Sequence, residues 1–133
     1  MFTTIVVGTD GSDRASQAVE RALMLASAYD ATLHVVHAYK GTREQVEDTA
    51  RAVADQLAEM LGTRGVEVRT HAMQGDPADV ILDFAYDAGA DLIVIGNRGM
   101  TGRRGHFSSI PNSISHDASC SVLIVPTAEE PEP

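Results

Sequence analysis

The sequence predicts an α/β fold built on a five-stranded parallel sheet, because short β-branched runs alternate with helical patterns along the chain. The expected strands are residues 4–8, 32–38, 66–73, 92–95 and 121–125. Crossovers between parallel strands are right-handed, so the intervening helices are expected on both faces of the sheet. We predict the strand order 3-2-1-4-5, in which a ligand crevice lies beyond the carboxyl ends of the first and fourth strands.

The first helix is predicted to follow the turn at residues 9–12 and to end near residue 30. Ser12 is a favourable N-cap for it. Apolar side chains then recur at the spacing of one helix face, at Ala15, Ala18, Val19, Ala22, Leu23 and Ala26. In the strand that follows, His34 and His37 point to opposite faces, so they cannot bind one metal ion together.

The middle of the chain predicts a helix, a strand and a second helix. Apolar residues step by threes and fours over residues 41–61, which indicates a long amphipathic helix. Residues 66–73 alternate, which predicts a strand exposed on one face and close to the sheet edge. Asp76 is an N-cap and Pro77 a first helical residue for the next helix. Its inner face is predicted to be Val80, Ile81, Phe84, Ala85 and Ala88.

The buried strand at 92–95 runs into a basic loop that is rich in glycine. Ser108 and Ser109 end the loop, and a short helix is expected at about 111–117, with Pro111 in its first turn. Backbone NH groups and the dipole of a helix favour negative charge, so this arrangement is typical of an anion site. We expect nucleotide phosphates here. The loop contains Gly96, Gly99, Gly102 and Gly105, with Arg98, Arg103 and Arg104 between them. The alternative is that Gly96 and Gly99 only make a tight turn and that the arginines are only solvated charges.

Composition narrows the class of partner. The formal net charge is −9, which argues against nucleic acid, because phosphate backbones need a basic face. No apolar run approaches the roughly 20 residues of a membrane span, so no membrane contact is expected. A single cysteine, Cys120, and a start without a basic leader favour the cytoplasm. We assign residues 1–127 to one domain and residues 128–133 to an acidic solvated tail.

Residues 5–12, IVVGTDGS, resemble the opening strand and turn of the universal stress protein family. Residues 96–99, GNRG, resemble the start of that family's nucleotide motif, and the last strand, SVLIV, is also similar. The resemblance covers almost the full length. It implies a Rossmann-like fold that binds ATP or another adenine nucleotide, such as AMP or cyclic AMP, with Mg²⁺ as a candidate companion. It also implies a homodimer and a regulatory role in the stress response.

The predicted nucleotide-binding residues come from both ends of the chain. Asp10 matches the family's acidic residue and is expected to accept hydrogen bonds from ribose hydroxyls or to hold a metal ion. Ala38 and Ile95 end their strands, where they are expected to wall an adenine pocket or simply to pack in the core. The full set is Gly8, Thr9, Asp10, Ala38, Ile95, Gly96, Asn97, Arg98, Gly99, Ser108, Ser109 and Ile110.

The loop departs from the family pattern at its end. The family motif closes with Gly-Ser or Gly-Thr, whereas this chain has Ser108-Ser109 and a loop one residue shorter when aligned from the last strand. Serine resists the positive φ that glycine allows. A dimeric scaffold that has lost nucleotide binding is therefore one alternative function. A cyclic-AMP-binding member and a slow ATP hydrolase are the others.

No catalytic residue is assigned, because the chain has neither a nucleophile elbow nor a Walker lysine motif. No metal site is assigned either, because His116, Asp117 and Cys120, at a helix-to-strand junction, make a poor zinc set. Assembly is predicted instead from the last strand, which is expected at the sheet edge. An apolar edge invites pairing with a second copy. The predicted homodimer contact is made by Val122, Leu123, Ile124 and Val125.

Overall fold

The computed structural model of the chain describes residues 2–10, 12–39, 48, 51–52, 55–59, 62, 65–97 and 109–127, with the backbone alone at 13, 14 and 109. Most of the helix expected at 41–61 lies outside these residues, and those described within it are helical. Residues 98–108 of the glycine-rich loop and the expected tail at 128–133 also lie outside them.

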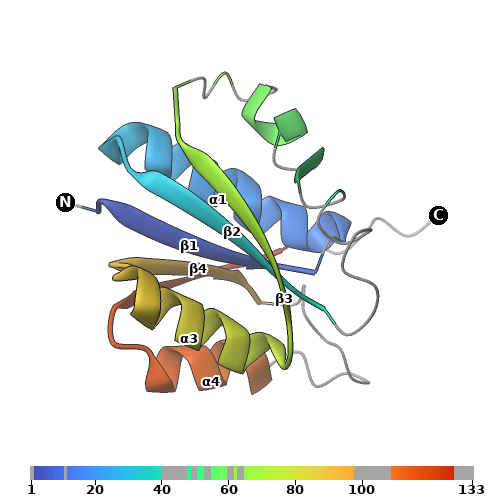
Figure 1. Cartoon of the computed structure of the whole chain (residues 1–133), viewed down its shortest axis with the longest axis vertical. Coiled ribbons are helices and arrows are strands. Elements are labelled where there is room, and N and C mark those ends of the chain that lie inside the picture. Colours follow the sequence, from blue (N-terminus) through green and yellow to red (C-terminus); the bar gives the residue numbers. More distant parts are fainter. Residues whose placement is uncertain are drawn as a thin grey trace.

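Five parallel strands form the sheet, in the predicted order β3-β2-β1-β4-β5 (Figure 1). They are β1 (Thr4–Thr9), β2 (Thr32–Tyr39), β3 (Val68–Gln74), β4 (Leu92–Gly96) and β5 (Ser121–Val125). Four of them, β1 to β4, end one residue later than predicted, and β3 also begins two residues later than predicted. The direction of strand addition reverses at β1, between β2 and β4. In sheets of this kind ligands bind at that reversal, beyond the carboxyl ends of the strands.

Helices cover both faces of the sheet, as predicted. In Figure 1, α1 (Asp13–Tyr29) lies on one face, whereas α3 (Pro77–Ala88) and α4 (Ser109–Asp117) lie on the other. Each face has its own hydrophobic core, and burying a large aliphatic side chain stabilises the fold by about 1.5–3 kcal/mol. The α1 face buries Ile5, Val7, Leu33, Val35, Leu92 and Val94 with Ala18, Ala22 and Leu23; the α3–α4 face buries Val6, Val36, Ile93 and Ile95 with Ile81, Ile110 and Ile114.

Polar side chains fix the starts of the helices. The Ser12 hydroxyl accepts a hydrogen bond of 3.1 Å from the backbone NH of Ala15 and caps α1. The Asp76 carboxylate accepts one of 3.3 Å from the backbone NH of Asp79, and Pro77 occupies the first turn of α3. Both N-caps confirm the sequence prediction.

The predicted inner face of α3 is largely confirmed. Ile81 and Ala85 are buried, and Val80 and Phe84 are half-buried beside them. The prediction was wrong for Ala88, which is exposed. Ala88 is the last residue of the helix, beyond the turns that pack on the sheet.

β3 is an edge strand, as its alternating pattern predicted, and a histidine pair joins it to β2. Nδ1 of His34 and Nε2 of His71 lie 3.0 Å apart, so one imidazole donates a hydrogen bond to the other. The centroids of the two rings are 5.2 Å apart. This is close to the nitrogen–nitrogen distance plus one ring radius on each side, so the two nitrogens point at each other. Phe84 covers the pair from α3, with its ring centroid 4.5 Å from that of His71.

Candidate functional site

The candidate site lies at the carboxyl edge of the sheet, where β1 and β4 are neighbours. Thr9 ends β1 and is buried, and the exposed residue Asp10 follows it. Gly96 ends β4, and Asn97 follows it. The structure therefore brings four of the predicted residues, from positions far apart in the sequence, to one edge.

The Asp10 carboxylate is positioned by the turn after β1. One of its oxygens, Oδ1, accepts a hydrogen bond of 2.9 Å from the backbone NH of Ser12. Because Ser12 also caps α1, the start of that helix fixes the carboxylate relative to the sheet. An ionised carboxylate can accept about four hydrogen bonds. Asp10 therefore keeps the capacity to accept hydrogen bonds from a ligand.

His37 lies beside Thr9 on the neighbouring strand, and the sequence pattern assigned it no role here. The two residues are register partners in β2 and β1, and His37 is only 8% exposed. Burial lowers the pKa of His37, and the nearby carboxylate of Asp10 opposes part of that shift. The signal that would have placed His37 at the site is the parallel pairing of residues 4–9 with residues 32–37.

Asn97 joins the start of the glycine-rich loop to the segment after β5. Its side-chain oxygen accepts hydrogen bonds from the backbone NH of Thr127 at 3.0 Å and from the Thr127 hydroxyl at 3.1 Å. Its own backbone NH donates to the carbonyl oxygen of Val125 at 3.0 Å. Thr127 is only 5% exposed, and no sequence motif marked it. The Asn97 carbonyl group thus holds the loop start in place.

Two predicted site residues pack in the hydrophobic core. Ile95 is 0% exposed and Ile110 is 8% exposed, and both lie in the cluster of the α3–α4 face. Of the two interpretations given to Ile95, core packing describes its side chain. The backbone of Ile110, in the first turn of α4, remains at the helix start.

The other predicted residues are distributed around the same edge. Gly8 is the second-last residue of β1, Ala38 is half-buried near the end of β2, and Ser109 begins α4. The roles of three more stay predictions because they lie outside the described residues: Arg98, Gly99 and Ser108.

Comparison with known proteins decides the family. The model of the universal stress protein family matches residues 1–126. The chain belongs to the universal stress protein family. A universal stress protein of Mycobacterium tuberculosis is 34% identical over 145 residues, covering 95% of this chain and 97% of that protein. One from Thermus aquaticus is 36% identical over 137 residues, covering 94% and 99% of the two proteins.

Solved universal stress proteins share the fold. One, crystallised in complex with cAMP, is 32% identical to this universal stress protein, with a TM-score of 0.81, and the match covers 96% of this chain and 98% of that chain. Another, from Archaeoglobus fulgidus in complex with dAMP, is 26% identical, with a TM-score of 0.69 and coverage of 92% and 97%. The predicted fold and family are confirmed.

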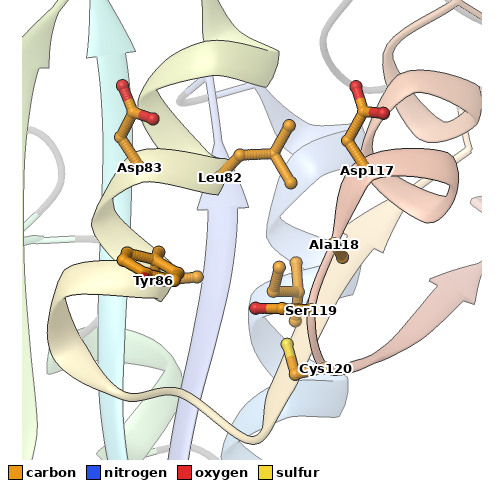
Figure 2. Close-up of a pocket in the computed structure, with 9 residues that line it drawn as sticks. Leu82, Asp83, Tyr86, Asp117, Ala118, Ser119 and Cys120 are labelled. Carbon is orange, nitrogen blue, oxygen red and sulfur yellow. The ribbon is translucent and has the colours of Figure 1, made fainter.

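A separate hollow of about 380 Å³ lies between α3 and α4 of this universal stress protein (Figure 2). Leu82 and Ile93 contribute apolar surface, and Asp83 and Asp117 stand on opposite sides. Burial raises the pKa of the Cys120 thiol, which also lines it, so the thiol stays protonated at neutral pH. The hollow lies at the amino ends of β4 and β5, at the other end of the strands from the candidate site.

In the part of the chain that the structure describes, no three histidine, cysteine or acidic side chains are grouped closely enough to hold a metal ion. Among the same residues, no helix combines the length and apolar character needed to cross a lipid bilayer.

Proposed function

We propose that this universal stress protein binds an adenine nucleotide at the carboxyl edge of its sheet, between β1 and β4. The proposal rests on one observation. The turn that holds Asp10 and the end of β4 lie at the same edge of the sheet, where the strand order reverses. The similar structures support it, since one is a complex with cAMP and another a complex with dAMP. Both ligands consist of adenine, a sugar and a phosphate.

In the proposed orientation, the nucleoside lies over β1 and β2 and the phosphates lie on the β4 side. Ribose hydroxyls donate to the Asp10 carboxylate, and Ala38 is close to the base. Backbone NH groups of the glycine-rich loop and of the first turn of α4 bind the phosphates. With ATP, a Mg²⁺ ion would be held by the phosphates and Asp10, because the ion prefers oxygen ligands. The remaining residues assigned to the ligand are Gly8, Thr9, Gly96, Asn97, Arg98, Gly99, Ser108, Ser109 and Ile110.

Nucleotide binding is proposed to regulate a stress response, with the bound and empty forms presenting different surfaces to a partner. Asn97 supports this role because it fastens the beginning of the phosphate loop to Thr127, so ligand contact at the loop is transmitted to the segment after β5. A single cysteine in the whole sequence supports a reducing, cytoplasmic location.

A homodimer through β5 is part of the proposal. β5 is an edge of the five-stranded sheet, paired only with β4 within the described residues. Ile124 is 40% exposed, and Val122 and Leu123 are half-buried, whereas Val125 is buried. An exposed apolar edge strand favours association with a second copy across a two-fold axis.

The proposed function is tested by equilibrium titration of the purified protein with AMP, cAMP and ATP, the last with and without Mg²⁺. We expect saturable binding of at least one of them at a single site. Asp10→Ala removes the ribose acceptor and is expected to weaken binding roughly tenfold or more, as for loss of a hydrogen bond to a charged group.

Two controls make this titration specific. Asp10→Asn keeps an oxygen that can accept from Ser12, so it preserves the turn while removing the charge. Asp87→Ala removes an exposed carboxylate from α3 and is expected to leave affinity unchanged. Wild-type protein that binds none of the three nucleotides at millimolar concentration would favour the nucleotide-free scaffold instead.

A further inference from the structure

The buried imidazole of His37 has a polar atom that the described structure does not satisfy. His37 is 8% exposed, and its Nδ1 has no hydrogen-bond partner within the part of the chain that the structure describes. Leaving a buried donor or acceptor unpaired is unfavourable, and such groups are uncommon in folded proteins. A buried atom of this kind, at the edge of a candidate site, indicates that a partner is supplied from outside the fold.

The position of His37 identifies which part of a nucleotide would supply that partner. Its side chain is on the α1 face of β2, as are those of Leu33 and Val35, and it lies beside Thr9 of β1. Adjacent strands are about 4.8 Å apart, so β2 is roughly 10 Å from β4. The phosphate-binding segment proposed above follows β4. His37 therefore lies on the nucleoside side of the site.

The protonation state of the His37 imidazole indicates which kind of ligand group it can bind. Burial lowers the pKa of His37, and the Asp10 carboxylate is the charged group acting against that shift among the described residues. The imidazole is therefore mainly neutral at neutral pH. A neutral ring has one nitrogen that accepts a hydrogen bond. Adenosine offers donors in its ribose hydroxyls and in its exocyclic amino group.

We infer that His37 is a ligand-binding residue of this universal stress protein, whose Nδ1 accepts a hydrogen bond from the nucleoside part of the nucleotide. The inference rests on the proposed nucleotide site. It adds a side chain of β2 to that site and makes the protonation of one imidazole a determinant of affinity.

The test measures adenosine affinity by calorimetry, because adenosine has no phosphate whose own titration near pH 6 would obscure the result. His37→Phe keeps a flat ring and removes both nitrogens, and it is expected to weaken binding roughly three- to tenfold. His37→Asn keeps a polar atom close to the Nδ1 position and is expected to recover part of the loss. His34→Phe is the matched control, since His34 is on the same strand but on the opposite face.

Analogues of adenosine identify which of its groups donates the hydrogen bond to His37. 2′-Deoxyadenosine and 3′-deoxyadenosine each lack one hydroxyl, and purine riboside lacks the amino group. The analogue without the relevant donor is expected to bind wild-type protein and His37→Phe equally well. The other two are expected to keep the three- to tenfold difference.

Two further measurements separate binding from a structural role. Wild-type affinity for adenosine is expected to fall between pH 7.5 and pH 5, because protonation converts Nδ1 from an acceptor to a donor, and His37→Phe is expected to abolish that dependence. The urea midpoint of the ligand-free His37→Phe protein is expected to be equal to or above that of wild type, since an unpaired buried polar atom has been removed.

The outcomes distinguish this inference from the proposed function. Wild-type protein that binds neither AMP nor adenosine would overturn both. Wild type and His37→Phe that bind adenosine equally, with the same pH dependence, would overturn the role of His37 and leave the nucleotide site intact. A large loss of stability in ligand-free His37→Phe would mean that the imidazole supports the fold instead.

Discussion

At the residue scale, Asp91 shows how one side chain can join two distant segments. Its carboxylate accepts hydrogen bonds from the backbone NH of Thr3 at 2.9 Å, from the Thr3 hydroxyl at 3.1 Å and from the backbone NH of Thr4 at 3.2 Å. These bonds fasten the start of β1 to the turn before β4. Burial alone would raise the pKa of Asp91, but the hydrogen bonds from Thr3 and Thr4 outweigh it and hold the pKa below its usual value.

Asp91 is expected to make folding stability depend on acid pH. A carboxyl whose pKa is lower in the folded state contributes stability that is present above its unfolded pKa of about 3.9 and is lost as pH falls through the folded pKa. Asp91→Ala is expected to lower the free energy of unfolding by about 1–2 kcal/mol at pH 7, through the loss of three accepted bonds. Urea denaturation at pH 7 and pH 3 measures this, and the difference should shrink at the lower pH. Asp87→Ala, an exposed change in α3, should have little effect at either pH.

Residue roles could be predicted from the sequence where they depend on neighbours in the chain. Ser12 and Asp76 are N-caps, and each acts on a residue only three positions away. Asp91 and His37 could not be found in this way. Their roles depend on strands that meet only when the sheet has formed, and neither has a local motif.

At the element scale, β3 depends on the histidine pair as well as on its backbone pairing with β2. Burial lowers the pKa of both His34 and His71, and for His71 the neighbouring imidazole and Arg69 lower it further. Arg69 lies next to Glu67, with which it forms an ion pair on the exposed side. Both histidines are therefore neutral in the folded state at neutral pH, and one imidazole donates a hydrogen bond to the facing nitrogen of the other.

Acid is expected to loosen this edge of the sheet. A histidine whose pKa is lowered by folding gives stability that is present above its unfolded pKa of about 6.5 and is lost as pH falls through the folded pKa. His71→Phe removes the shared hydrogen bond and is expected to cost about 1 kcal/mol at pH 8. The cost should be smaller at pH 5, because the stability that depends on neutral imidazoles declines as pH falls below the unfolded pKa. Hydrogen exchange of the β3 amides at the two pH values locates the effect, and uniform exchange across the sheet would contradict it.

Most elements could be predicted because their apolar residues either recur at a regular spacing or form a continuous run. β4 is a continuous apolar run, and all five of its residues are buried. The inner face of α3 could not be predicted to its end, since Ala88 continues the apolar spacing within the helix but is exposed. Periodicity identifies the face of a helix but does not indicate where the sheet beneath it stops.

At the scale of the whole molecule, the strand order leaves two edges with different chemistry. β3 exposes Arg69 and Gln74 beside Met73, whereas β5 exposes Ile124 and Ser121 and no charged residue. The order itself was predictable, because right-handed crossovers leave few arrangements for alternating strands and helices. Residues 98–108 of the glycine-rich loop lie outside the described residues, so the phosphate contacts expected of them stay a prediction.

Ile124→Asp is expected to convert the proposed dimer into a monomer, because it places a charge in the middle of an apolar contact between edge strands. Sedimentation velocity at tens of micromolar protein measures the change. Met24→Asp, at a residue of α1 that is 50% exposed, is the matched control and should remain dimeric. A wild-type protein that sediments as a monomer at this concentration would count against the dimer itself.

The bond between Asn97 and Thr127 has a practical consequence for anyone who labels or fuses this protein. The segment just after β5 is hydrogen-bonded to the start of the loop that is proposed to bind phosphates, since the side-chain oxygen of Asn97 accepts from both the backbone NH and the hydroxyl of Thr127. A fluorophore attached just downstream of Thr127 would consequently act as a reporter of occupancy. For the same reason, a bulky affinity handle attached there is expected to disturb the contact between Asn97 and Thr127.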